Sequence, residues 1–399
     1  MTDQYRGSSR QSYQNKMGYF QNRSTEFAII GGGLLGSAVT YYLAKAGRQA
    51  TLIERGSICS EASGANAGSL HLQIYIHPSW DSTYLDRIRP TVELHRQAAL
   101  HWQTLEVELS TDLGVRLGGG LMVAETPDQF ELLRRKVALE NSMGLETQLV
   151  GSRQMMDIAP YLATHLIGAD YLPKEGFANP LLVGPAFTQR AVQYGAQILT
   201  GTEVRTIVPK PRGGFIIGTS QGDLGAARII NSAGAWASQI ARMVGLKFPT
   251  QGAVAQVSVT EACEPIMRGQ LIQHVGRGLT LKQSPRGNFI IGGGWRGGYE
   301  SATGRKLPLR DSIVGNIWVA ASTVPSLRQV HLMRSWGGMG SWTMDGLPAI
   351  GESMRVRDFF MLHCNLGFTL GTVAARALAE KIMTGKASVE LEIYDPDRF

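Results

Sequence analysis

The sequence has few cysteines and no long apolar run. Its 399 residues include 3 cysteines, at positions 59, 263 and 364, which lie far apart without C-x-x-C spacing. This pattern excludes a disulfide framework and favours no zinc or iron–sulfur site, so we expect a reducing compartment, the cytoplasm, and no metal. A transmembrane helix needs a run of about 18 apolar residues, and none occurs. Residues 1–23 are polar and lack a secretory pattern, so we expect a mobile tail there.

Charge of one sign is not concentrated in any segment. The formal net charge is +7, but apart from the run 134–136 the basic residues are scattered. A solvated basic surface is therefore favoured over nucleic-acid binding, although an anionic substrate would be attracted. Glycine, in contrast, is abundant: 48 residues, well above the roughly 7% of an average protein. This abundance suits a fold with tight turns and close backbone approaches to a ligand.

The glycines of residues 27–55, FAIIGGGLLGSAVTYYLAKAGRQATLIER, form a G-x-G-x-x-G motif. Phe27 to Ile30 is a short apolar run typical of a buried strand, and Gly31, Gly33 and Gly36 follow it. Such glycines permit a tight turn, the approach of a pyrophosphate and close helix packing. A helix then leads to a second strand, 50–53. We therefore predict a βαβ unit that binds a nucleotide.

The acidic residue Glu54 ends the second strand, 18 residues beyond Gly36. In dinucleotide-binding folds a carboxylate at this place accepts hydrogen bonds from the adenosine ribose hydroxyls. It would also repel a 2′-phosphate. The order of strand, glycines, helix and acidic residue favours nucleotide binding over a chance surface turn.

Three further segments have small residues where a ligand could approach the backbone. Residues 56–74, GSICSEASGANAGSLHLQI, form a polar loop suited to wrapping a pyrophosphate and the edge of a flat ring. Residues 228–244 repeat the order of strand, small-residue turn and helix, and 367–369 precede a helix that Gly385 closes. Residues 253–259 and 288–292 look like strands of a separate sheet. For each loop the alternative is an ordinary turn.

These motifs resemble the D-amino acid oxidase and glycine oxidase superfamily of FAD-dependent amine oxidoreductases over about residues 26–395. The specific matches are GGGLLG with Glu54, SGANAGSL, FANP, IINSAGAWA, WGGMGSWTMDGLPAIG and GFTLG. Within it the chain looks most like the FAD-bearing subunits of opine oxidase, D-hydroxyproline dehydrogenase and hydrogen cyanide synthase complexes. The resemblance implies an α/β fold with a Rossmann-like FAD-binding domain, 24–88, 150–245 and 331–399. It also implies a separate substrate domain with a mixed or antiparallel sheet, residues 89–149 and 246–330.

The resemblance also implies non-covalent FAD, lying extended from Glu54 to the start of the last helix. That helix would stabilise negative charge on the reduced ring with free N–H groups and its positive dipole end. The implied cofactor-binding residues are Gly31, Gly33, Leu34, Leu35, Gly36, Glu54, Arg55, Ser63, Asn66, Ala67, Gly68, Ser69, Val204, Ala233, Gly234, Trp236, Gly340, Gly367, Phe368 and Thr369.

The substrate end departs from the best-known members. Glycine oxidase-like enzymes carry an arginine that clamps the substrate carboxylate, and here Gly340 stands in its place. Their pocket tyrosine falls near Thr280. Lys282, Arg296 and Arg334 are candidates to replace the missing charge, although a solvated cation is the commoner role of each. Trp295, Trp336 and Trp342 could form aromatic walls or belong to the core, and His71 is more often structural than a base.

The function implied is oxidation of a C–N bond by hydride transfer to flavin N5, on a secondary amine such as an opine or on a D-amino acid. Positioning would carry most of this chemistry, and no acid–base pair is required. Two alternatives remain open: a stand-alone glycine, sarcosine or D-amino acid oxidase, and a subunit that uses FAD only as an electron relay. Partner subunits carrying electron-transfer cofactors, and a second flavin, FMN, at a subunit interface, are further expectations.

Overall fold

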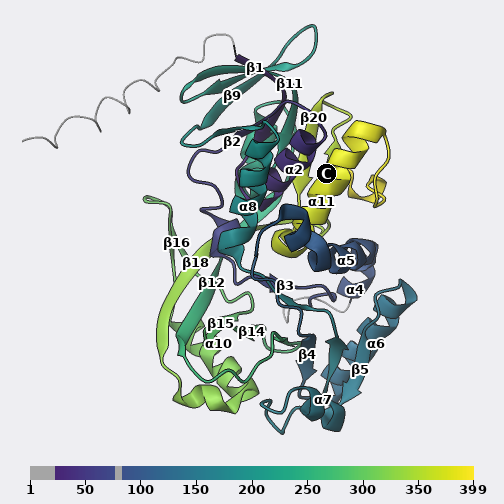
Figure 1. Cartoon of the computed structure of the whole chain (residues 1–399), viewed down its shortest axis with the longest axis vertical. Helices are drawn as coiled ribbons and strands as arrows, with labels where there is room; N and C mark the ends of the chain where they lie inside the picture. The colour runs from purple at the N-terminus through teal and green to yellow at the C-terminus, as the bar shows by residue number, and fades with distance from the viewer. Residues whose placement is uncertain (1–22, 77–82) are drawn as a thin grey trace, which may run out of the picture.

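A computed structural model describes residues 23–76 and 83–399 of the chain. The predicted tail, 1–23, lies outside this part except for Arg23, which begins the first strand. Figure 1 shows two halves, each built around its own large sheet. Within the described residues, no helix is long and apolar enough to cross a membrane.

The first sheet has eight strands in the order β19-β20-β11-β1-β2-β8, with β10 and β9 added beside β11. The strands β1, β2, β8, β11 and β20 pair in parallel, as expected for a nucleotide-binding α/β sheet. Its members are β1 (Arg23–Ile30), β2 (Ala50–Ile53), β8 (Gln197–Leu199), β9 (Val204–Pro209), β10 (Phe215–Thr219), β11 (Gly222–Asn231), β19 (Ala349–Glu352) and β20 (Phe359–His363).

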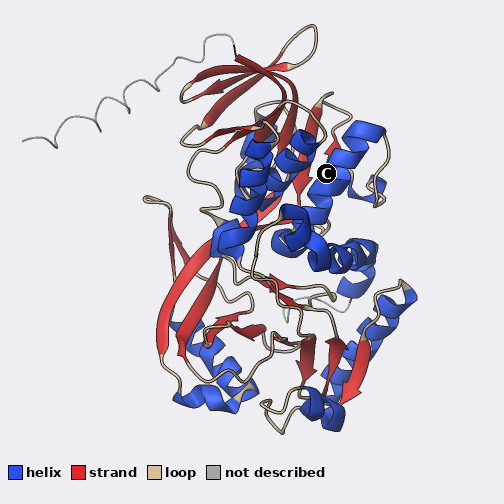
Figure 2. Ribbon diagram, in the orientation of Figure 1, coloured by secondary structure: helices blue, strands red, loops and turns tan. Residues whose placement is uncertain are grey.

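Figure 2 shows the helices of this half packed beside the first sheet. They bury one large apolar cluster. They are α2 (Leu34–Lys45), α5 (Val92–Leu109), α8 (Pro180–Gln193) and α11 (Gly367–Thr384). The ends of α2 and α11 follow the sequence: Gly47, just beyond α2, has a φ of 77°, and Gly385 closes α11 with a φ of 75°. Such left-handed positions favour glycine at helix ends. A shorter helix, α9 (Ala237–Arg242), follows β11.

The second sheet also has eight strands, in the order β18-β12-β15-β14-β13-β4-β6-β5, and nearly all of its pairs are antiparallel. Its members are β4 (Gly120–Ala124), β5 (Gln148–Gly151), β6 (Gly168–Leu172), β12 (Thr250–Ala262), β13 (Leu271–His274), β14 (Leu279–Gln283), β15 (Asn288–Gly292) and β18 (Leu332–Thr343). The helices of this half are α6 (Pro127–Ser142), α7 (Ser152–Ile158) and α10 (Arg310–Thr323). The predicted class, a Rossmann-like domain with a separate mixed sheet, is confirmed.

Several small elements lie outside the two large sheets. They are α3 (Ala62–Ala65), β3 (Ser69–Leu70), α4 (Tyr84–Ile88), β7 (Gly176–Phe177), β16 (Gly298–Glu300) and β17 (Arg305–Leu307). The segment 56–74, expected to be a loop, thus contains one helical turn. The domain boundaries stay a prediction, and strand pairing crosses two of them. Strands β18 and β6 and the end of β5 fall within the ranges predicted for the FAD-binding domain, but they belong to the second sheet, where β18 pairs with β12, β6 with β4, and β5 with β6.

Candidate functional site

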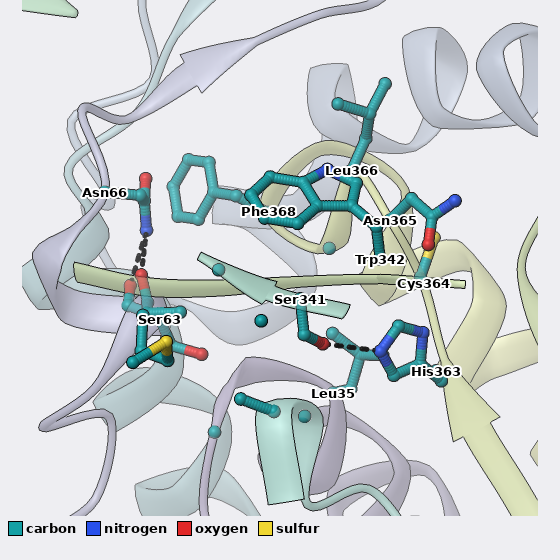
Figure 3. A pocket seen from close by; sticks show the side chains of 18 of the residues that line it. Leu35, Ser63, Asn66, Ser341, Trp342, His363, Cys364, Asn365, Leu366 and Phe368 are labelled. Carbon is teal, nitrogen blue, oxygen red and sulfur yellow. Dashed lines mark hydrogen bonds between the residues drawn. The ribbon is translucent and has the colours of Figure 1, made fainter. Parts of the chain in front are cut away.

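A cavity of about 1050 Å³ lies between the two sheets. Its walls come from the carboxyl ends of β1 and β2, the segment 61–71, strands β12 and β18, and the start of α11. Cavities that bind small molecules usually measure about 300 to 1,000 Å³, so this one has room for a dinucleotide. Figure 3 shows how side chains of α2, the segment 63–66, β18 and the segment 363–368 surround one part of it.

The glycines of the first turn are needed for the backbone path. Gly31 has a φ of 108°, and a Cβ there would lie 2.7 Å from the carbonyl oxygen of Ser232. A Cβ at Gly36 would overlap the carbonyl oxygen of Gly31. Gly33 borders the cavity itself, where a Cβ would lie 3.0 Å from the hydroxyl of Ser63. The motif therefore brings bare backbone to the cavity wall, as the sequence predicts.

The carboxylate of Glu54 lies at the cavity and is held by backbone N–H groups. Its two oxygens accept hydrogen bonds from the N–H groups of Gly32 and Gly56, both at 2.7 Å. These donors fix the side chain at the end of β2, where a ribose hydroxyl could reach its remaining lone pairs. On the same side, the guanidinium of Arg55 stacks 3.9 Å from the ring centroid of Trp236. Val204, Ala233 and Gly234 also line this region.

The SGANAG segment is tied down by its own polar groups. The amide of Asn66 donates to the carbonyl of Ser63 at 2.7 Å, and its oxygen accepts the N–H of Gly68 at 2.7 Å. The Ser63 hydroxyl accepts the N–H of Leu34 at 2.9 Å, which joins the segment to the start of α2. Ser63, Asn66, Ala67 and Ser69 line the cavity, whereas Gly68 and Gly36 lie behind it.

The first turn of α11 closes the cavity beside α2. Gly367, Phe368 and Thr369 line it, as does Leu35 of α2. A Cβ at Gly371 would overlap the side chain of Leu35, so glycine allows the two helices to pack closely. The first N–H groups of a helix have no partner inside the helix, and they carry the positive end of its dipole. Two helix N-termini therefore point to a place for negative charge.

The wall from the second half contains four of the predicted substrate residues. Thr280 is buried and lines the cavity beside Gly292, and Arg296 lines it from the segment after β15. Gly340 and Trp342 line it from β18, and a Cβ at Gly340 would lie 2.9 Å from the indole of Trp342. The space that an arginine would enter is therefore covered by an aromatic ring.

Four other candidates do not line the cavity. The indole N–H of Trp336 donates to the carbonyl of Ala65 at 2.8 Å, so this residue holds the SGANAG segment. Arg334 is exposed on β18. Lys282 is fully buried and donates to the hydroxyl of Ser69 at 2.8 Å, and burial lowers its pKa to about 7. Its predicted contact with a substrate carboxylate stays a prediction, and the contact it makes here is with the cavity wall. The indole N–H of Trp295 likewise donates to a backbone carbonyl, that of Gly278.

The sequence did not indicate some polar residues that line the cavity, among them two near the start of α11. Ser341 and His363 share a hydrogen bond of 2.6 Å at the cavity, drawn in Figure 3, and burial lowers the pKa of His363 to about 4. His363 ends β20, shortly before the GFTLG segment. Its place at the carboxyl end of a parallel strand, where ligands bind in such sheets, could have pointed to it. His95, on α5, was also missed because nothing local distinguishes it.

The residues present fit a flavin dinucleotide. The glycine turn leaves backbone at the wall, Glu54 is held where a ribose could bind, and two helix N-termini face the same cavity. The cavity continues beyond the start of α11 to Thr280 and Arg296, so a small molecule has room beside the ring.

Comparisons with known proteins agree with this geometry. A family model described as FAD dependent oxidoreductase matches residues 26–381. A subunit of the opine oxidase of Rhizobium meliloti is 26% identical over 94% of this chain and 97% of its own length. The mitochondrial dimethylglycine dehydrogenase of Rattus norvegicus is 25% identical, but this chain spans only 45% of its length.

Solved structures show the same fold. The glycine oxidase of Geobacillus kaustophilus superposes with a TM-score of 0.82 at 24% identity, over 95% of this chain and all of that one. L-proline dehydrogenase from P. horikoshii gives a TM-score of 0.83 at 24% identity, with 94% and 98% covered. Since the family model spans most of the sequence, the chain belongs to the DAO family of FAD-dependent oxidoreductases.

Proposed function

We propose that this protein oxidises the C–N bond of a secondary amine, with an opine as the first choice of substrate and a D-amino acid as the second. The observation that carries the proposal is the continuous cavity that joins the nucleotide turn to the wall of the second sheet. The similarity to an opine oxidase subunit over nearly the whole of both chains supports the choice of substrate class.

FAD, bound without a covalent bond, supplies a hydride acceptor at N5, and water hydrolyses the resulting imine to a carbonyl compound and an amine. The chain contributes position and charge. The N-terminus of α11 would stabilise negative charge on the ring, and the segment 63–69, fixed by its own hydrogen bonds, would hold the edge of the ring. Cys364 lines the cavity, but burial raises the pKa of its thiol to about 12, which disfavours a thiolate able to attack the ring.

Arg296 is our candidate for the group that holds the substrate carboxylate. It is exposed and lines the cavity, and no hydrogen bond or ion pair joins its guanidinium to any of the residues that the structure describes. A cation without a partner beside a cavity suits an anionic ligand, and arginine can bind a carboxylate with two parallel hydrogen bonds. This assignment needs no cation at residue 340, and the larger substituent of an opine would lie against the ring of Trp342, which lines the cavity.

We further propose that the chain acts in the cytoplasm as the catalytic subunit of a hetero-oligomer whose partners pass electrons onward. The opine oxidase relative is named as one subunit of its enzyme, which supports a complex. A second flavin at a subunit interface stays a prediction.

The test is anaerobic bleaching of the purified flavoprotein by opines, D-hydroxyproline, sarcosine and D-amino acids. We expect rapid bleaching by at least one opine. Bleaching by sarcosine or glycine alone, with rapid reoxidation by oxygen, would favour a stand-alone oxidase. No bleaching by any amine, with bleaching restored by a partner subunit, would favour the electron-relay alternative and contradict the proposal.

A further inference from the structure

A chain of buried hydrogen bonds leads from the cavity wall into the second half of the molecule. It begins at His71, which follows the SGANAG segment and lines the cavity. Nδ1 of His71 lies 2.9 Å from Oε1 of Gln273, on β13. The other side of that amide, Nε2, donates to Oε2 of Glu175 at 3.0 Å. Gln273 and Glu175 are both fully buried, so each hydrogen bond has a defined direction that water does not exchange.

The residues at the far end of this series of hydrogen bonds determine which group donates in each bond. Nζ of Lys136 donates to Oε1 of Gln73 at 2.9 Å, and the same ammonium pairs with Asp170 and Glu140. The amide nitrogen of Gln73 must therefore point the other way, and it donates to Oε2 of Glu175 at 2.6 Å. A lysine ammonium has only donors, so it leaves Gln73 no choice of orientation.

Glu175 accepts and does not donate. Its Oε1 also receives the backbone N–H of Gln73 at 3.0 Å, so its two oxygens accept three N–H groups. Burial raises the pKa of Glu175 to about 8, but a protonated acid would direct its own O–H at one of these donors. The three donors favour the carboxylate. Gln273 then donates to Glu175 and must accept from His71, which places the ring proton of His71 on Nδ1.

The backbone of His71 is equally fixed. Its N–H donates to the hydroxyl oxygen of Thr369, at the start of α11, at 3.0 Å. Its carbonyl lies 3.0 Å from Nδ1 of His95, which also lines the cavity. The ring contacts Tyr75, with 4.5 Å between centroids. Main chain, ring orientation and tautomer are thus all set by neighbours from different elements.

We infer that His71 presents the lone pair of Nε2 to the cavity and there accepts a hydrogen bond from the N–H of the substrate amine. Nε2 has no hydrogen-bond partner among the residues 23–76 and 83–399, although the ring lies at the wall. An acceptor in this place selects molecules that carry an N–H over isosteres that carry an ether oxygen. The inference rests on the proposed function and deepens it, because it assigns a residue that recognises the amine.

The surroundings keep the imidazole neutral. Burial lowers the pKa of His71 to about 4, against the hydrogen bond that it donates to Gln273, which raises the pKa, and Lys282 and His95 act in the same direction as burial. A neutral ring at working pH retains the lone pair that the amine needs. Gln273 and Glu175 act through His71 and are positioning residues.

The experiment compares two dicarboxylates of the same shape, iminodiacetate and diglycolate, which differ by N–H against ether oxygen. Each is titrated under anaerobic conditions into the FAD-loaded wild-type protein whose flavin has first been reduced with dithionite, so that the amine cannot be oxidised, and the change in protein fluorescence gives its Kd. For the wild type we expect iminodiacetate to bind roughly tenfold more tightly than diglycolate. The ether oxygen of diglycolate would direct a lone pair at the lone pair of Nε2 and form no hydrogen bond with it. In His71→Leu the two affinities should become equal within about threefold. Gln273→Leu removes the acceptor that holds the ring proton on Nδ1, so its ratio of affinities should lie between those of the wild type and of His71→Leu.

The matched control is His101→Leu. His101 is a buried histidine that contacts the hydroxyl of Tyr42 at 3.3 Å and does not line the cavity. This variant should keep the wild-type ratio of affinities. Equal binding of the two ligands by the wild type, binding of neither, or an unchanged ratio in His71→Leu would overturn the inference. Amine bleaching of the flavin in the same preparation judges the proposed function separately, since oxidation could proceed without selection by His71.

Discussion

The two ends of the cavity differ in what lines them, backbone groups at one end and side chains at the other. At the nucleotide end the wall is mostly backbone: a glycine with a φ of 108°, helix N–H groups, and a carboxylate held by two other N–H groups. At the substrate end the wall is made of side chains, including Thr280, Arg296, Trp342 and His71. The first end depends on a conformation of one short segment. The second depends on residues that strands far apart in the sequence bring together.

This difference decides what a substitution does. A backbone-built wall tolerates almost no added atom, because a Cβ meets main chain that cannot move away. A wall of side chains can lose or gain a group and still hold a ligand of another shape. The nucleotide end should therefore fail completely when altered, while the substrate end should change its preference.

Gly33→Val should have the largest effect, the loss of flavin binding at the nucleotide end of the cavity. The added side chain would enter the cavity beside Ser63, in the place expected for the pyrophosphate. We expect purification without flavin, measured as the ratio of flavin to protein absorbance. The control is Gly151→Val, at a position where a Cβ meets nothing within 4 Å. A yellow Gly33→Val protein at full occupancy would contradict the assignment.

The same contrast explains what the sequence could predict. The glycine turn, Glu54 and the entry to α11 lie within short segments whose spacing is itself the signal, and the structure places them at one cavity. The orientation of Trp336 could not be predicted, because its partner, the carbonyl of Ala65, is 271 residues away. Gln273 and Glu175 have no local pattern either, since each matters only through the other.

Gly340→Arg should change which substrates the substrate end of the cavity accepts. The indole of Trp342 covers this position, so the new side chain must displace the ring and narrow the cavity. We expect kcat/KM for an opine to fall more than about tenfold while that for sarcosine changes less than about threefold. Adding Trp342→Ala should restore part of the opine activity. Unchanged opine turnover in Gly340→Arg would mean that residue 340 does not limit the pocket.

Arg296→Met should weaken anionic substrates without altering flavin content. The loss of a charge-assisted contact predicts a rise in KM of roughly tenfold, with a smaller change in kcat if the contact is equal in ground and transition states. Arg334→Met is the matched control, because Arg334 is exposed on β18 and does not line the cavity. An equal effect of both variants would indicate only a general charge effect.

Lys282→Met should have the smallest effect on activity and a measurable one on stability. Burial lowers the pKa of Lys282 to about 7 from its ordinary 10.5, so between these values the unfolded chain binds more protons than the folded one. The wild type therefore gains stability as pH rises from 7 towards 10. Methionine removes this dependence, so the variant should be more stable than the wild type at pH 7, by about 1–3 kcal/mol after the lost hydrogen bond to Ser69. Its advantage should shrink by pH 9.5, and urea unfolding at the two pH values measures the difference.

The control for this buried lysine is Lys136→Met, which should change stability in the opposite direction. Burial alone would lower the pKa of Lys136, but Asp170 and Glu140 outweigh burial and raise it. Methionine would leave those two carboxylates buried without their partner, so this variant should be less stable than the wild type. A higher KM for an anionic substrate in Lys282→Met, with no stabilisation at pH 7, would instead support the substrate contact that the sequence predicts, and would move the charged part of the substrate end from Arg296 towards Ser69.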